Sequence, residues 1–93
     1  MVEATITVKH KVGLHARPAA VFAKTAQSFE ADITIKNVTR DTQPVNAKSV
    51  INLFKSAVSQ GHSIHLTANG SDEEAALAAL VGLIEDNFGD KEE

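Results

Sequence analysis

The stretch KVGLHARPAA, residues 11–20, places His15 two residues before Arg17. Gly13 precedes the histidine, and Pro18 follows the arginine at a position typical of the first turn of a helix. The first N–H groups of a helix lack intrahelical partners, and the macrodipole adds partial positive charge, so a helix start attracts anions. The stretch therefore combines an imidazole, a guanidinium and a predicted anion site.

An imidazole at this place has the properties of a phosphoryl acceptor. The positive helix end disfavours imidazolium, so we expect the His15 ring to be neutral and nucleophilic. The backbone N–H groups of Ala16 and Arg17 would then donate to the phosphoryl oxygens, and the Arg17 guanidinium adds a bidentate contact. There is no G-x-x-x-x-G-K-[ST] loop, and the carboxylates form no magnesium pattern. We therefore expect a carrier that depends on partners for loading and unloading, and not an enzyme.

Length and composition set the class of protein. The chain has 93 residues, of which 43% are hydrophobic, so we expect one domain, 1–93, with residues from about 89 to 93 as an acidic tail. The absence of cysteine excludes disulfides, thiolate metal sites and cysteine nucleophiles. No apolar run approaches the roughly 18 residues that suggest a membrane span. We expect a cytoplasmic monomer without a bound cofactor or metal.

The charge is unevenly distributed along the chain. The net charge is −3, yet residues 1–27 carry four cations against Glu3 alone, and residues 70–93 carry eight acids against Lys91. Neither an extended basic stripe nor an aromatic platform is present, so nucleic acid is not an expected ligand. A small anion at the basic N-terminal segment fits the pattern better.

Alternation of apolar and polar residues predicts four strands. Residues 2–9, 32–38 and 63–69 each have one apolar face, and residues 10–14 form a loop. A short strand over residues 42–45 contains Pro44, which indicates an edge position.

A period of 3.6 residues predicts three helices. The first runs from about 16 to 28, the second begins after Ser49 and ends by Gly61, and the third ends at Gly89. Ser71 and Glu74 form a capping box for the third helix. The predicted core faces are Ala19, Phe22, Ala23 and Ala26; Val50, Leu53, Phe54, Ala57 and Val58; and Leu77, Leu80, Val81 and Ile84.

The predicted elements are arranged in the order strand, helix, strand, strand, helix, strand, helix. One-sided strands and short connections favour an α+β fold with a mostly antiparallel sheet and helices on one face.

The motif GLHARPAA resembles the active-site signature of the HPr family, the histidine-containing phosphocarriers of the phosphoenolpyruvate-dependent sugar phosphotransferase system. The resemblance extends to VNAKSV, the Gly61 turn and ANGSDEEAALAAL. It implies an open-faced β-sandwich, a four-stranded antiparallel sheet with three helices on one face. It also implies that enzyme I, phosphorylated from phosphoenolpyruvate, phosphorylates His15 on Nδ1. Arg17 would support the phosphoryl group until enzyme II A domains accept it for sugar uptake.

A second matching segment is NAKSVINLF. The resemblance makes Ser49 a target of the HPr kinase/phosphorylase, although a serine here can equally be a simple helix N-cap. The resemblance also makes Val50, Ile51 and Phe54 the docking patch for enzyme I and the enzyme II A domains. Three apolar neighbours on a short helix cannot all face inward, so Ile51 is expected to be exposed. Residues 37–45 are slightly longer than in many relatives.

Other functions remain open on the sequence. One alternative is an HPr-like paralogue in a nitrogen-related or dihydroxyacetone-related phosphorelay. Outside this class stand a small metal- or effector-binding module and an acylphosphatase-like hydrolase. The remaining histidines, His10, His62 and His65, are expected at the surface, and their spacing does not indicate a metal site.

Overall fold

Strands and helices follow one another along the chain in the predicted order. The computed structural model describes residues 1–9, 16–56 and 58–86, except for the side chains of residues 16 and 17. The elements are β1 Val2–Thr7, α1 Ala16–Gln27, β2 Asp32–Asn37, β3 Val45–Asn46, α2 Val50–Lys55, β4 Ser63–Asn69 and α3 Glu73–Glu85. Residues 10–15, and with them the predicted loop over 10–14, lie outside the described residues.

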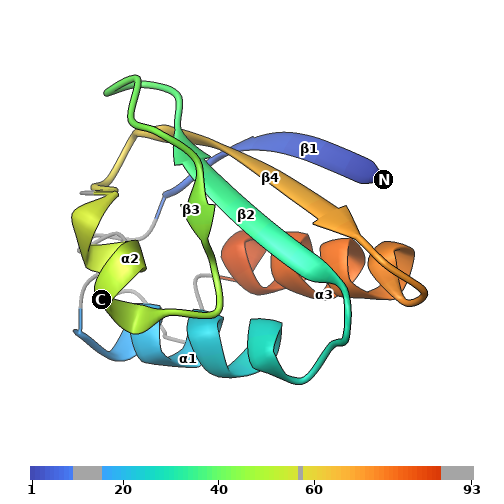
Figure 1. Cartoon of the computed structure of the whole chain (residues 1–93). Coiled ribbons are helices and arrows are strands. Elements are labelled where there is room, and N and C mark those ends of the chain that lie inside the picture. The colour runs from blue at the N-terminus through green and yellow to red at the C-terminus, as the bar shows by residue number, and fades with distance from the viewer. Residues whose placement is uncertain (10–15, 57, 87–93) are drawn as a thin grey trace.

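The strands form one antiparallel sheet with the order β1-β4-β2-β3. Leu66 of β4 lies at the centre, opposite Ala4 of β1 and Ile35 of β2. Figure 1 shows α1 and α3 side by side below the sheet and α2 beside β3. The expected α+β fold, an open four-stranded sheet with three helices, is confirmed.

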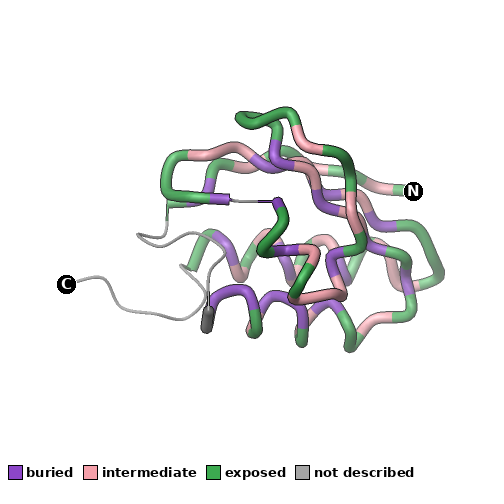
Figure 2. Tube along the Cα trace, turned by 60° about the vertical axis from the view of Figure 1, so that its left-hand side comes forward, coloured by how far each residue is buried: buried purple, intermediate pink, exposed green. Residues whose placement is uncertain are grey.

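The core lies between the sheet and the helices, as the purple segments of Figure 2 show. From the predicted apolar faces of β2 and β4 come the buried residues Ile33, Ile35, Ile64, Leu66 and Ala68. From α1 come Ala19, Phe22, Ala23 and Ala26, all with no exposed surface. The alternate positions of the strands, such as Thr34 and His65, lie on the open face of the sheet. The period-2 and period-3.6 patterns thus identified the correct faces of β2, β4 and α1.

The third strand is later and shorter than predicted. It comprises Val45 and Asn46, whereas the sequence indicated residues 42–45. Pro44 has no N–H to donate to a ladder, and it precedes the strand. The edge position is confirmed, because β3 pairs only with β2 in the described sheet.

Helix α2 is shorter than predicted. It ends at Lys55, and Ser56 is its C-cap, with the N–H and the Oγ of Ser56 both donating to the carbonyl of Asn52. The carbonyl of Ser56 accepts a bond from the buried Asn37 side chain instead of continuing the helix. Val58 belongs to the connection between α2 and β4, and it is nevertheless fully buried. Phe54, predicted for the core face, is 45% exposed.

Helix α3 begins and ends differently from the prediction. Its N-cap is Asp72 and not Ser71, and the expected capping box is replaced by the Glu73 carboxylate accepting from the N–H of Gly70. The helix ends at Glu85, four residues before Gly89. Leu80 and Ile84 are buried as predicted, and Ala76, which was not predicted for the core face, is buried as well. Leu77 and Val81 are only half-buried.

Candidate functional site

The predicted phosphoryl acceptor, His15, lies outside the described residues, and its role stays a prediction. The structure does describe the helix after it, because α1 begins at Ala16. The backbone N–H groups of Ala16 and Arg17 therefore belong to the first helical turn, where intrahelical partners are lacking. No acidic residue occupies that turn to offset the positive helix end. The Arg17 side chain is not among those described.

The first turn of α1 is held firmly against the core. Pro18 is buried, and Ala19 and Phe22 have no exposed surface. Proline in the first turn costs no hydrogen bond and presets the backbone angle of the helix. Because α1 begins at Ala16, Pro18 lies in its first turn, as predicted.

The chain on the other side of residues 10–15 is also anchored. After β1, the N–H of Val8 donates to the His62 carbonyl over 2.9 Å, and the Val8 carbonyl accepts from Gly61 over 2.8 Å. The Gln60 side-chain amide donates to the Lys9 carbonyl over 3.3 Å. The turn before β4 thus holds the segment that enters the His15 motif. The sequence pattern marked Gly61 as a turn but gave no sign of this contact.

Ser49 is the N-cap of α2. Its backbone is extended, with φ −104° and ψ 120°, and its Oγ accepts from the Asn52 N–H over 3.3 Å. The predicted capping role is confirmed. Phosphorylation of Ser49 stays a prediction.

The three residues of the predicted docking patch differ in exposure. Ile51 is 66% exposed and Phe54 is 45% exposed, whereas Val50 is half-buried and packs against the core. Leu53, on the opposite side of the helix, has no exposed surface. We use the name docking patch for Ile51, Phe54 and the exposed edge of Val50. The prediction that Ile51 is exposed is confirmed.

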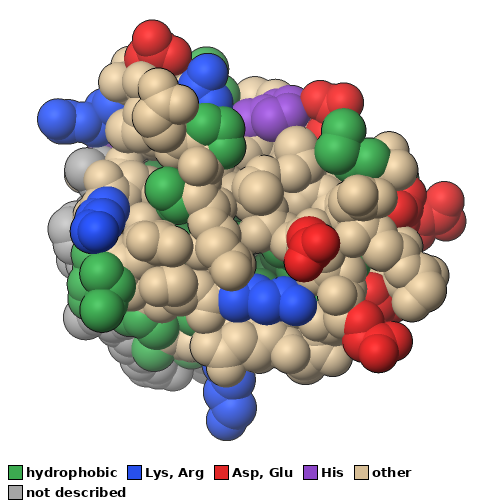
Figure 3. All heavy atoms as spheres, in the orientation of Figure 1, with side chains coloured by type: hydrophobic (Ala, Val, Ile, Leu, Met, Phe, Trp, Pro, Cys, Tyr) green, Lys and Arg blue, Asp and Glu red, His purple; other side chains and the backbone are tan. Residues whose placement is uncertain are grey.

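Charge is separated over the surface. Figure 3 shows most acidic side chains of this view on the right, near the starts of β1 and α3, and several basic side chains on the left. At the acidic end, N–H groups of Glu30 and Ala31 lower the pKa of the Asp72 carboxyl, with each hydrogen bond 2.8 Å long. The Gly70 N–H likewise lowers the pKa of Glu73, which also pairs with the N-terminal amine at 3.0 Å.

The two histidines among the described residues, His62 and His65, have different hydrogen-bond partners. His65 lies on the open face, as predicted, where its ring contacts Glu3 at 2.9 Å and Thr5 at 2.8 Å. His62 is half-buried, and its Nδ1 accepts from the Ser59 N–H over 3.2 Å. His10 lies outside the described residues. Within the described parts of the chain no three His, Cys, Asp or Glu side chains converge as metal ligands, and no helix is long and apolar enough to cross a membrane.

Comparison with known proteins gives a consistent result. Residues 2–86 match the family described as PTS HPr component phosphorylation site. The chain is 44% identical over 85 residues to the HPr-like protein Crh of Halalkalibacterium halodurans, covering 91% of this chain and 98% of that one. A crystal structure of HPr from Thermoanaerobacter tengcongensis superposes with a TM-score of 0.93 and 48% identity, covering 99% of this chain and 100% of that one.

A longer relative is also similar. The chain is 41% identical over 87 residues to a multiphosphoryl transfer protein of Vibrio cholerae. The match covers 94% of this chain but only 22% of that protein. A relative of nearly equal length, which is 39% identical over 88 residues and covers 95% of this chain and 97% of that one, is the phosphocarrier protein HPr of Treponema pallidum. The match over residues 2–86, together with the identity and shared fold, shows that this chain belongs to the HPr family.

Proposed function

We propose that this protein accepts a phosphoryl group on Nδ1 of His15 from phosphorylated enzyme I and passes it to enzyme II A domains. The phosphoryl group originates from phosphoenolpyruvate. The transfers take place in the cytoplasm and serve sugar uptake. The observation that carries the proposal is the family match over residues 2–86, which includes the whole GLHARPAA motif.

The chemistry depends on the placement of α1. The Nδ1 lone pair attacks phosphorus, the new N–P bond forms as the bond to the enzyme I donor breaks, and no water is consumed. N–H groups of the first turn of α1 then donate to the phosphoryl oxygens, and Arg17 offsets their charge. The anchors at Val8 and Pro18 support this proposal, because positioning supplies most of the rate in phosphoryl transfer.

Partners are proposed to dock on the docking patch of α2. An exposed isoleucine and phenylalanine on one short helix are suited to burial against another protein. Phosphorylation of Ser49 by the HPr kinase/phosphorylase would place charge next to these apolar side chains and weaken docking.

Labelling with radioactive phosphoenolpyruvate and enzyme I tests the proposal. We expect the wild type to acquire phosphate that is labile to acid and stable to base, and His15→Ala to remain unlabelled. His65→Gln is the matched control, because it removes a different imidazole, on the open face of the sheet. A wild type that stays unlabelled with an enzyme I competent on another HPr would refute the proposal. Equal labelling of His15→Ala would refute the assignment of the acceptor.

A further inference from the structure

The turn between β2 and β3, residues 38–44, has one well-defined shape. The Arg40 N–H donates to Oδ1 of Asn37 over 3.2 Å, and the Thr42 N–H donates to the Asn37 carbonyl over 3.1 Å. The Thr42 hydroxyl in turn accepts from the Asn37 N–H over 3.0 Å. Asp41 has a positive φ of 54°, a conformation that aspartate tolerates better than most residues. These contacts hold the turn internally.

The same turn is fastened to the start of β4. The Thr39 hydroxyl accepts from the Ser63 N–H over 2.8 Å, and the Val38 N–H donates to the Ser63 carbonyl over 2.9 Å. Because both contacts are to backbone, the position of the turn relative to the sheet does not depend on a flexible side chain of β4.

Asn37 links this turn to α2. Its side chain has no exposed surface, and its Nδ2 donates to the carbonyl of Ser56, the C-cap of α2, over 2.9 Å. Its Oδ1 accepts from Arg40. A single buried amide thus joins the backbone of Arg40 to the end of the helix that carries Phe54. The position of the Arg40 backbone is consequently linked to that of the C-terminal end of α2.

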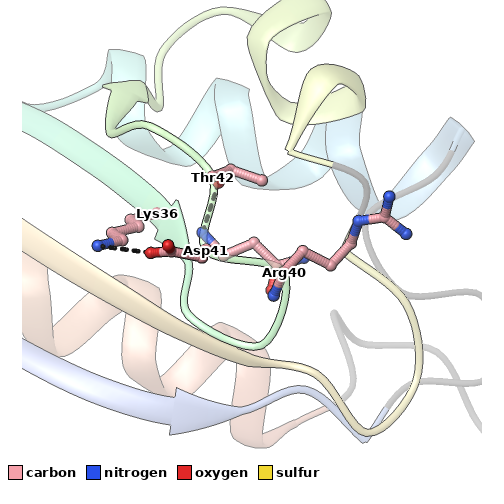
Figure 4. A network of polar contacts seen from close by, with 5 residues as sticks. Lys36, Arg40, Asp41 and Thr42 are labelled. Carbon is pink, nitrogen blue, oxygen red and sulfur yellow. Dashed lines mark hydrogen bonds and ion pairs between the residues drawn. The ribbon is translucent and has the colours of Figure 1, made fainter.

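The Arg40 side chain extends into solvent. Figure 4 shows it on the opposite side of the turn from the ion pair between Lys36 and Asp41, which measures 3.4 Å. Among the described residues, none of the ion pairs involves its guanidinium. Lys55, in the last turn of α2, is also exposed. Arg40, in the turn that Asn37 joins to the end of α2, and Lys55, in the last turn of α2, are thus two exposed cations.

We propose that the Arg40 guanidinium is part of the docking surface and pairs with a carboxylate on an acidic surface of the protein that donates the phosphoryl group. This inference rests on the proposed function, because it assumes that partners dock at α2. Arginine presents a planar fork that binds carboxylate in a bidentate manner. The acidic end of the chain, where β1 and α3 begin, repels such a partner, so the charge separation in Figure 3 favours approach from the α2 end.

Steady-state phosphorylation by enzyme I tests the role of Arg40. We expect Arg40→Gln to raise KM about two- to fivefold at low ionic strength and to leave kcat unchanged, since exposed pairs have modest energies. High salt should remove most of the difference, because screening weakens the pair. Arg40→Lys should raise KM less than Arg40→Gln does, because it keeps the positive charge. Arg40→Glu should raise KM more than Arg40→Gln does, because it reverses the charge. Lys36→Gln is the matched control, because Lys36 is paired with Asp41 and lies on the open face.

The outcomes separate this inference from the proposed function. An unchanged KM for Arg40→Gln in low salt, or an equal rise for Lys36→Gln, overturns the role of Arg40 while phosphorylation of His15 stands. A fall in kcat with constant KM also overturns it, since that result belongs to a group at the reacting atoms. A wild type that enzyme I cannot phosphorylate overturns the proposed function and this inference together. Thermal unfolding of each variant checks that the change at the exposed Arg40 leaves the fold intact.

Discussion

The N–H of Gly61 donates a 2.8 Å hydrogen bond to the carbonyl of Val8, which joins the turn before β4 to the chain entering the His15 motif. Gly61 has a φ of +88°, so the contact depends on a backbone conformation that residues with a Cβ rarely adopt.

Replacing Gly61 by alanine should destabilise the protein by roughly 1–3 kcal/mol through backbone strain. An added Cβ would meet nothing within 4 Å, so crowding does not contribute. Gly82→Ala is the control, because a Cβ there also meets nothing, and the position is helical. Alanine at position 82 should stabilise the protein by about 0.5–1 kcal/mol. Urea unfolding measures the free energy of unfolding of both variants. A change of the same sign in the two variants would contradict the role of backbone strain at Gly61.

The Asp72 carboxylate should make stability fall in acid. Hydrogen bonds from Glu30 and Ala31 lower its folded-state pKa below the ordinary 3.8, so its contribution is complete above the unfolded-state pKa. That contribution is lost as pH falls through the folded-state pKa. Asp72→Asn should therefore be less stable than the wild type at neutral pH. The difference in stability between the two proteins should become smaller in acid. Urea midpoints measured over this range provide the test, and a gap independent of pH would contradict it.

Ser49→Ala should lower stability by about 1 kcal/mol, because the acceptor for the Asn52 N–H is lost. Ser49→Asp retains a capping oxygen but adds charge beside the docking patch, so it should raise KM for enzyme I with little change in stability. Ser71→Asp serves as control, since it adds the same charge to an exposed serine just before α3, away from α2 (Figure 1). Loading kinetics that are equal in the two aspartate variants would place docking elsewhere.

Substitutions of two adjacent residues of α2 should distinguish a loss of partner docking from a loss of folding stability. Phe54→Ala should raise KM for enzyme I with a small loss of stability, because Phe54 is 45% exposed. Leu53→Ala removes a fully buried side chain and should cost about 2–5 kcal/mol. Thermal unfolding and loading rates are measured on both variants. A Phe54→Ala protein that loads normally would exclude this side chain from the interface.

Arg17→Ala should slow phosphoryl transfer much more than it changes stability. The guanidinium is proposed to offset phosphoryl charge, a role absent from the unphosphorylated fold. Rapid-quench transfer rates, compared with the urea midpoint, give the two quantities. Parallel losses in both would indicate a structural role for Arg17.

The sequence by itself determined the order of the elements and the inward faces of β2, β4 and α1. Alternation placed Ile64 and Leu66 inward, and helical spacing placed Phe22 against the sheet, because burial of one face imposes these periods on any sequence. The His15 motif was also readable from the sequence, since its meaning depends on neighbours only a few residues away. The N-cap role of Ser49 is local in the same sense.

Tertiary structure decided where elements end and which polar groups meet. The Asp72 carboxylate bonds to Ala31, 41 residues earlier, and not to its own helix, so the local capping rule misplaced the start of α3. Asn37 continues the inward phase of Ile33 and Ile35, yet a buried amide there is tolerated only because Ser56 and Arg40 supply its partners. The contacts of Asp72 with Ala31 and of Asn37 with Ser56 join residues 41 and 19 positions apart, and they form only once the sheet and helices have packed together.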